Sequence, residues 1–226
     1  MKILINREDI LSPLQQVIGA VERKQTLPIL GNVLIKTTNG KLSLTTTDLE
    51  IEMIAHMDLS IQEDIATTLP ARKLLDICKA LPEQSDISFE IQENQVTLKS
   101  ARSRFTLASL PAKDFPTTED IEAAAELSVA QNILKKLIDK TAFAMAQQDV
   151  RYYLNGLLIE LDSQIIRLVA TDGHRLALSE HEGETGINNH RQIILPRKGV
   201  LELGRLLSTS EEEARLEISN NHIRVH

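Results

Sequence analysis

The sequence predicts an α+β protein built from two tandem copies of one folding unit. The main observation is an internal repeat: residues 30–54 align without a gap with residues 154–178, so that each position corresponds to the one 124 residues further along. In both copies, segments with the apolar period of a helix alternate with segments in which every second residue is apolar, as in a strand. A polar, proline-containing segment at residues 108–124 separates the copies. We therefore expect one domain at residues 1–120 and a second at residues 121–226.

Each copy is expected to contain two helices packed against antiparallel sheet. Apolar spacing across residues 10–21 predicts the first helix, and alternation across residues 41–46 predicts a strand. Asn39-Gly40 predicts a hairpin turn, because both residue types accept a positive φ. In the second copy, Ser128 fits a capping box that opens a helix.

The second copy is expected to be incomplete. In the first copy, the strand containing Val96 and Leu98 runs on into residues 99–111, whereas the equivalent strand in the second copy stops at His226. We therefore expect a chain that is truncated before the last strands of its second domain.

Composition indicates a folded, soluble protein. Hydrophobic residues make up 42% of the sequence and charged residues 25%, and no apolar run reaches the roughly 18 residues of a membrane-spanning helix. We expect a cytoplasmic protein without membrane association. The one cysteine, Cys78, lies in an apolar periodic segment, which predicts a buried thiol and no disulfide.

The net charge of −7 would ordinarily argue against a nucleic-acid partner, but its distribution matters more than its sum. Basic residues gather in short segments, namely Arg23 and Lys24, Arg72 and Lys73, Arg102 and Arg104, Lys135, Lys136 and Lys140, and Arg197 and Lys198. Two interpretations stay open, a protein with one basic and one acidic face or ordinary solvated surface.

The tetrapeptide Asp172-Gly173-His174-Arg175 lies between two predicted strands, which indicates a hairpin turn first. An enzymatic alternative is a hydrolase with His174 as base and Asp172 as its orienting group. Residues two apart on a turn rarely reach that geometry, and the sequence contains no G-x-S-x-G, H-E-x-x-H, P-loop or dinucleotide-binding motif. We therefore expect a protein that is not an enzyme and that uses no cofactor or metal.

Several segments together resemble the bacterial sliding clamp family, the β subunit of the replicative DNA polymerase. They are QQDVRYYLNGLLIE, RLVATDGHRLA, QTLPILGNVLI, LPARK and LPRKG. The resemblance covers essentially the whole chain. It implies three similar domains in each subunit, of which the third is absent here, and two subunits closed head to tail into a ring around double-stranded DNA. It also implies binding that is independent of DNA sequence, because it depends on phosphate attraction.

The resemblance implies DNA contacts on the helices that line the ring. Lys135, Lys136 and Lys140 would then face phosphates. The DNA-binding residues implied by the family are Lys24, Arg72, Gln148, Tyr152 and Tyr153. Position 24 is Arg in the homologue compared, and Lys keeps its charge but not its forked geometry. Without the resemblance, the two tyrosines would be interpreted as ordinary strand residues.

The resemblance also implies a surface pocket for short linear peptides from the polymerase, the clamp loader and repair proteins. Its residues in this sequence are Leu154, Thr171, Gly173, His174, Arg175 and Leu176. The family's remaining pocket residues correspond to positions beyond 226. The implied subunit interface consists of Lys73, Arg102, Arg104, Phe105 and Leu107, although alternating arginines also protect a solvated edge strand. The alternative function is a protein-binding repeat module without a role at DNA.

Overall fold

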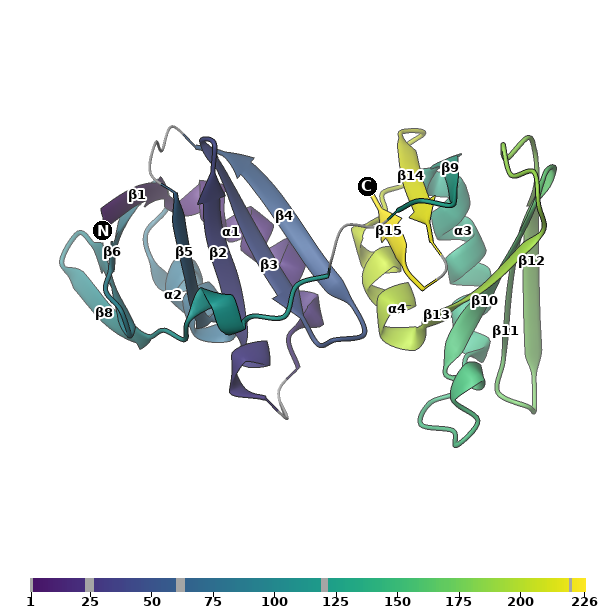
Figure 1. The fold of residues 1–226 in the computed structure, drawn as a ribbon, viewed down its shortest axis with the longest axis horizontal. Helices are drawn as coiled ribbons and strands as arrows, with labels where there is room; N and C mark the ends of the chain where they lie inside the picture. Colours follow the sequence, from purple (N-terminus) through teal and green to yellow (C-terminus); the bar gives the residue numbers. More distant parts are fainter. Residues whose placement is uncertain (1, 23–26, 60–63, 119–121, 220) are drawn as a thin grey trace. The chain divides into compact units, whose positions relative to one another are not determined.

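The structure, a computed structural model, describes residues 2–22, 27–59, 64–118, 122–219 and 221–226. The chain divides into two compact units, Met1–Thr118 and Glu119–His226. Each unit combines helices with antiparallel strands (Figure 1). Among the residues that the structure places, no helix has the length and apolar character needed to cross a membrane.

The described residues of unit 1 form two antiparallel sheets of four strands each. The sheet with order β4-β3-β2-β5 is formed by Glu52–Asp58, Lys41–Thr47, Asn32–Thr38 and Ile65–Pro70. The sheet with order β1-β6-β7-β8 is formed by Lys2–Asn6, Asp86–Ile91, Gln95–Ser100 and Ser103–Ala108. The helices are α1 (Arg7–Val17) and α2 (Ala71–Ala80), with short 3-10 helices η1 (Ile18–Ala20), η2 (Pro28–Gly31) and η3 (Ala112–Asp114).

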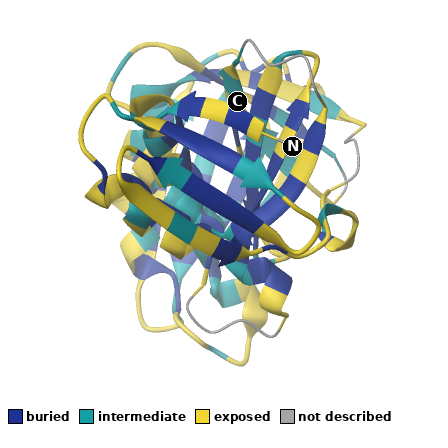
Figure 2. Ribbon diagram, turned by 90° about the vertical axis from the view of Figure 1, so that its left-hand side faces the viewer, coloured by how far each residue is buried: buried dark blue, intermediate teal, exposed yellow. Residues whose placement is uncertain are grey.

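One core joins both helices and both sheets of unit 1. Ile10 of α1 and Leu74 of α2 are fully buried together with Leu44 of β3 and Phe89 of β6. Figure 2 shows buried and exposed residues alternating along strands, the pattern of a sheet with one face in the core. Cys78 is also fully buried, and this burial raises the pKa of its thiol to about 11. The prediction of a buried thiol is confirmed.

Unit 2 repeats this arrangement. The sheet with order β12-β11-β10-β13 is formed by Leu176–Glu182, Ile165–Thr171, Gly156–Asp162 and Arg191–Pro196. The sheet with order β15-β14-β9 is formed by Ile223–Val225, Glu213–Ile218 and Ala125–Ala130. The helices are α3 (Gln131–Thr141) and α4 (Arg197–Leu206), with 3-10 helices η4 (Ala142–Ala144) and η5 (Tyr152–Leu154).

The predicted repeat is confirmed by the element boundaries. Strands β2, β3 and β4 correspond to β10, β11 and β12, each beginning and ending 124 residues earlier. The α+β prediction of two helices with antiparallel sheets in each unit is also confirmed. The hairpin turn at Asn39-Gly40 has the expected positive φ angles of 51° and 78°. Tyr152 and Tyr153 lie in η5, so interpreting them as strand residues is wrong.

The predicted capping box at Ser128 is wrong. Ser128 points outward from β9, between buried Leu127 and Val129, and α3 begins only at Gln131 without a side-chain cap. The loop before β14 satisfies the helix start instead: the backbone N–H of Gln131 donates to the carbonyl of Glu212. Pairing of β9 with β14 determines this segment, and it overrides the local capping pattern.

The segment after β8 packs against unit 1 before the chain enters unit 2. Phe115 is buried with Ile29, Leu30 and Leu34. The hydroxyl of Thr68 on β5 donates to the carbonyl of Leu110 at 2.8 Å. The first half of the predicted junction is therefore a packed part of unit 1.

Candidate functional site

The candidate site is built on the turn between β11 and β12, where the carboxylate of Asp172 closes the chain on itself. Its Oδ1 accepts hydrogen bonds from the backbone N–H groups of His174 and Arg175, each at 3.0 Å. These two bonds, and then the ion pair with the Arg175 side chain, lower the pKa of Asp172. The carboxylate is therefore ionised at neutral pH and fixes the turn from within.

Thr171 and Gly173 complete the turn. The hydroxyl of Thr171 donates to the carbonyl of Arg175 at 2.7 Å and accepts from the N–H of Gly173 at 3.1 Å. Gly173 has a φ of 86°, in the left-handed region where a side chain costs roughly 1–2 kcal/mol. Thr171 therefore acts within the turn through its hydroxyl, and Gly173 through its backbone.

The equivalent turn of unit 1 has the same backbone scaffold. Oδ1 of Asp48 accepts from the N–H groups of Glu50 at 2.9 Å and Ile51 at 2.8 Å. Leu49 takes the place of Gly173 and has a φ of 79°. The hairpin geometry is thus common to both units, and only the side chains can distinguish a site in one unit from a plain turn in the other.

The arrangement of Asp172 gives no support to the hydrolase hypothesis. Its second carboxylate oxygen accepts from Nε of Arg175 at 3.0 Å. Both oxygens of Asp172 therefore accept hydrogen bonds from the turn itself. These bonds explain the position of the carboxylate without a role in orienting the imidazole of His174.

A groove of about 330 Å³ lies beside the turn. The guanidinium of Arg175 lies over the ring of Phe143, 5.5 Å from its centroid, in cation–π geometry. Phe143 on η4 is 58% exposed, and Arg197 at the start of α4 donates from Nη1 to the carbonyl of Met145 at 3.1 Å. The groove is lined by Phe143, Met145, Ala146, Gln147, Asp149, Asp172, His174, Arg175 and Arg197.

The structure brings part of the predicted pocket together at this groove. His174 and Arg175 line it, whereas Leu154, Thr171, Gly173 and Leu176 do not. Leu154 is half-buried in η5, and Leu176 is 65% exposed at the start of β12.

Sequence reasoning missed the remaining wall of the groove. Phe143 belongs to a chain with only four phenylalanines, and Arg197 belongs to a basic segment. Neither signal connects these residues with a turn that lies some thirty positions away from Phe143 and about twenty from Arg197.

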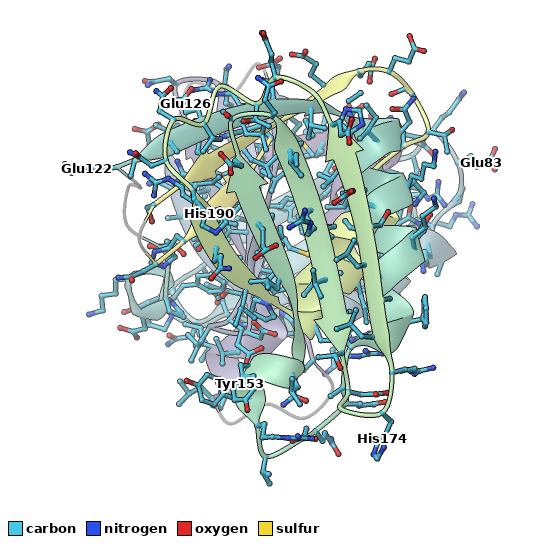
Figure 3. The ribbon with its side chains drawn as sticks, turned by 90° about the vertical axis from the view of Figure 1, so that its right-hand side faces the viewer. Glu83, Glu122, Glu126, Tyr153, His174 and His190 are labelled. Atoms are coloured by element: carbon cyan, nitrogen blue, oxygen red, sulfur yellow. The ribbon has the colours of Figure 1, made fainter. Side chains whose placement is uncertain are left out.

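Three of the predicted DNA-binding residues share one loop of unit 2. Gln148 is exposed and has a φ of 58°, and Tyr152 and Tyr153 are 82% and 51% exposed. The two rings meet edge to face, with centroids 5.9 Å apart. Figure 3 shows Tyr153 and His174 at the same end of the unit. An exposed aromatic pair thus lies at the same end of unit 2 as the candidate turn.

The other two predicted DNA-binding residues belong to unit 1. Lys24 lies outside the described residues. Arg72 is an exposed residue near the start of α2, and its Nη2 donates to the carbonyl of Val21 at 2.5 Å. This bond directs the guanidinium toward the segment that leads to Lys24.

The lysines of α3 have different surroundings. Nζ of Lys135 donates to the carbonyl of Gly204 at 2.6 Å, near the end of α4, a position where a positive charge is favourable. Lys136 and Lys140 are exposed. Lys135 is therefore already engaged by the protein, whereas the other two side chains extend into solvent.

Four of the five predicted interface residues lie on β8 or in the turn before it, and β8 is an edge strand of its sheet in unit 1. Arg104 is exposed and Phe105 is half-buried, but Leu107 is only 7% exposed and belongs to the core. Lys73 is exposed on α2, and Arg102 is exposed in the turn that precedes β8. A contact through Leu107 would thus involve mainly its backbone.

Comparison with known proteins identifies the family. Residues 1–119 match the N-terminal domain of the DNA polymerase III beta subunit, and residues 128–226 match its central domain. The chain belongs to the DNA polymerase III beta subunit family. A beta sliding clamp from Pseudomonas aeruginosa is 50% identical over 99% of the chain and 61% of its own length.

Solved structures of the family agree in fold. The crystal structure of the DNA polymerase III subunit beta from Pseudomonas aeruginosa superposes with a TM-score of 0.95 at 48% identity, covering 100% of this chain and 62% of that one. A sliding clamp from the same organism bound to griselimycin has a TM-score of 0.92 at 49% identity, covering 100% and 61%. The chain thus spans about 62% of the length of these members of the family.

Replacement of Leu49 by glycine is expected to stabilise unit 1. Leu49 is a branched residue held at positive φ by the Asp48 scaffold, so glycine removes the strain but adds freedom to the unfolded chain. The net gain should be about 0.5–1 kcal/mol in the free energy of unfolding, measured by denaturant titration. Glu50→Gly in the same turn is the control and should destabilise, because Glu50 does not have a positive φ. Equal effects of the two substitutions would contradict strain at Leu49.

Proposed function

We propose that the protein to which this chain belongs is a DNA sliding clamp, a processivity factor that encircles duplex DNA and tethers the replicative polymerase through a peptide-binding pocket. Membership of the beta subunit family supports this function. The observation that carries it is the capped turn of unit 2, which presents His174 and Arg175 at a surface groove. Cytoplasmic location, clamp loader and repair proteins as further partners, and head-to-tail pairing into a ring belong to the same proposal.

Binding to DNA requires no sequence readout in this proposal. The net charge of −7 is no obstacle, since local cations rather than the overall charge attract phosphates. The proposed contacts are Lys24, Arg72, Gln148, Tyr152 and Tyr153. The exposure of both tyrosines and of Gln148 on one loop supports their part in this set. Contacts of this kind allow the protein to slide along the duplex, because phosphate attraction does not depend on the base sequence.

The peptide pocket is proposed to extend from the groove across the turn. Leu154 and Leu176 would supply apolar surface. His174 and Arg175 would form a wall of the pocket, with their polar ends exposed to solvent. Thr171 and Gly173 would shape the turn between them. A related clamp that binds griselimycin supports a ligand site in the family.

The subunit contact is proposed to add a strand to the edge of β8. The residues proposed for it are Lys73, Arg102, Arg104, Phe105 and Leu107. A domain boundary near residue 120 is consistent with the division of the chain into two compact units.

A protein-binding repeat module without a role at DNA is the competing function, and salt-dependent binding to duplex DNA distinguishes the two. In the full-length protein, Arg72→Ala should weaken binding to a short duplex at low salt, because a phosphate contact is lost. The slope of log affinity against log salt concentration should fall by about 1.

The matched control is Lys41→Ala, which removes a 70% exposed lysine side chain from a hairpin of the same unit. This variant should bind the duplex as the parent does. If the parent shows no salt-dependent affinity for the duplex, or if both variants lose the same amount of affinity, the proposal that Arg72 contacts DNA is wrong.

Leu154→Ala in the full-length protein should weaken binding of a labelled peptide with leucine and phenylalanine anchors by roughly 1–3 kcal/mol, the usual effect of removing a buried aliphatic contact. DNA affinity should not change. Leu201→Ala on α4 of the same unit is the control, since Leu201 is also partly exposed but lies outside the proposed pocket. Titration with the peptide measures the affinity of each variant, and thermal unfolding shows whether the variant is still folded. Together they distinguish the loss of a peptide contact from the loss of the fold. Unchanged peptide affinity in Leu154→Ala would mean that the turn is only a hairpin.

A further inference from the structure

The chain contains two Asn-Gly pairs, Asn39-Gly40 and Asn155-Gly156, which have very different surroundings. In such a pair, the backbone nitrogen of the glycine can attack the side-chain carbonyl carbon of the asparagine, because glycine has no side chain to hinder the approach. The attack succeeds only where rotation about the bonds of the asparagine brings the two atoms together. The hydrogen bonds around each pair therefore decide which pair reacts.

The pair Asn39-Gly40 is free to rotate. Asn39 is exposed at the tip of the β2–β3 hairpin. Among the described residues, neither its side chain nor the peptide group that joins it to Gly40 forms a hydrogen bond. The turn is held by the pairing of Thr38 with Lys41 and by the N–H of Leu59, which donates to the carbonyl of Gly40 at 2.9 Å. Both contacts lie outside the peptide group that has to rotate.

The pair Asn155-Gly156 is fixed on every side. Nδ2 of Asn155 donates to the carbonyl of Asp149 at 2.8 Å, and Oδ1 accepts from the N–H of Asp149 at 2.9 Å. The backbone carbonyl of Asn155 accepts from the N–H of Arg197 at 2.9 Å. Gly156 is buried at the start of β10, where an added side chain would collide with the carbonyl of Leu195. Attack at Asn155 would first have to break these hydrogen bonds.

Asp172-Gly173 could in principle form the same ring, but it is fixed as well. The N–H of Gly173 donates to the hydroxyl of Thr171 at 3.1 Å, so the attacking nitrogen is engaged. The carboxylate of Asp172 accepts bonds from the turn and is ionised at neutral pH, and a negative charge makes its carbon resistant to a nucleophile. Of these three pairs, the structure leaves only Asn39-Gly40 free to react.

We propose that Asn39 is a site of spontaneous covalent modification, namely deamidation through a cyclic imide. The nitrogen of Gly40 forms a bond to Cγ of Asn39, and the bond from Cγ to the side-chain nitrogen breaks. That nitrogen leaves as ammonia, taking up the proton that the nitrogen of Gly40 loses. Water then adds to either carbonyl of the ring and opens it, which gives aspartate or isoaspartate at position 39. This inference goes beyond the proposed function and does not depend on it.

The modification changes the hairpin in two ways. It places a new carboxylate two residues from Lys41, whose Nζ lies 3.9 Å from the carboxylate of Asp58. In the isoaspartate product the main chain also passes through the former side-chain carbon and gains a methylene group. A two-residue turn sets the register of its strands, so the longer turn no longer fits the pairing of Thr38 with Lys41.

The test is incubation of the full-length protein at mildly alkaline pH, followed by proteolytic digestion and mass spectrometry of the peptides that contain Asn39 and Asn155. Asn39 should convert at least about tenfold faster, the factor given by a difference of about 1.4 kcal/mol in the activation barrier. Both aspartate and isoaspartate should form at position 39. Equal rates at the two asparagines would overturn the inference, and aspartate as the sole product would overturn the route through the ring.

The same incubation in denaturant separates the effect of the fold from that of the sequence. Both pairs should then convert at comparable rates, because the hydrogen bonds of Asn155 are lost. An Asn155 that still resists in denaturant would show that its sequence neighbours protect it, and an Asn39 that converts only in denaturant would show that its turn protects it. Either result would overturn the inference.

Asn39→Gln is the matched control variant. Its side chain keeps the amide but would have to close a larger ring, so conversion at position 39 should become negligible. Conversion of Asn155 in denaturant should stay as in the parent. Conversion at position 39 as fast in this variant as in the parent would contradict attack by the nitrogen of Gly40.

Discussion

The candidate site depends on one carboxylate, that of Asp172. It accepts hydrogen bonds from two backbone N–H groups at once and so holds the β11–β12 turn in one conformation. Without the carboxylate, these two N–H groups would bond to water. The positive φ at Gly173, the hydroxyl contacts of Thr171 and the placement of Arg175 over Phe143 all follow from that conformation. A lost cap would therefore affect every side chain that the turn presents.

The same cap at Asp48 gives both units a turn of the same backbone conformation. Both turns keep the aspartate, and the first copy tolerates a strained leucine where the second has glycine. In the second copy the guanidinium of Arg151 lies beside Gly173, where an added Cβ would lie 3.1 Å from Nη2, and the position equivalent to Arg151 in the first copy is Leu27. The scaffold is shared, and the differences in side chains distinguish the copy with the proposed pocket.

The repeat, the strands and the equivalence of the two turns could be predicted from the sequence, because they depend on local periodicity and on an ungapped alignment. The capping box at Ser128 was wrong because pairing of β9 with β14 outweighed a local pattern. The groove could not be predicted, since Phe143, Arg197 and the turn meet only after η4 and α4 pack together. The closeness of the Arg151 guanidinium to Gly173 could not be predicted either, because no rule of sequence spacing connects these two segments.

The most direct measurement compares peptide affinity in two full-length variants, Asp172→Ala and Asp48→Ala. Each removes the same two backbone hydrogen bonds from the same kind of turn, but only the first turn belongs to the proposed site. The account predicts that Asp172→Ala loses at least about tenfold in affinity, equivalent to one cap of about 1.4 kcal/mol, while Asp48→Ala binds as the parent does. Peptide affinity that survives in Asp172→Ala, or that falls equally in both variants, would contradict it.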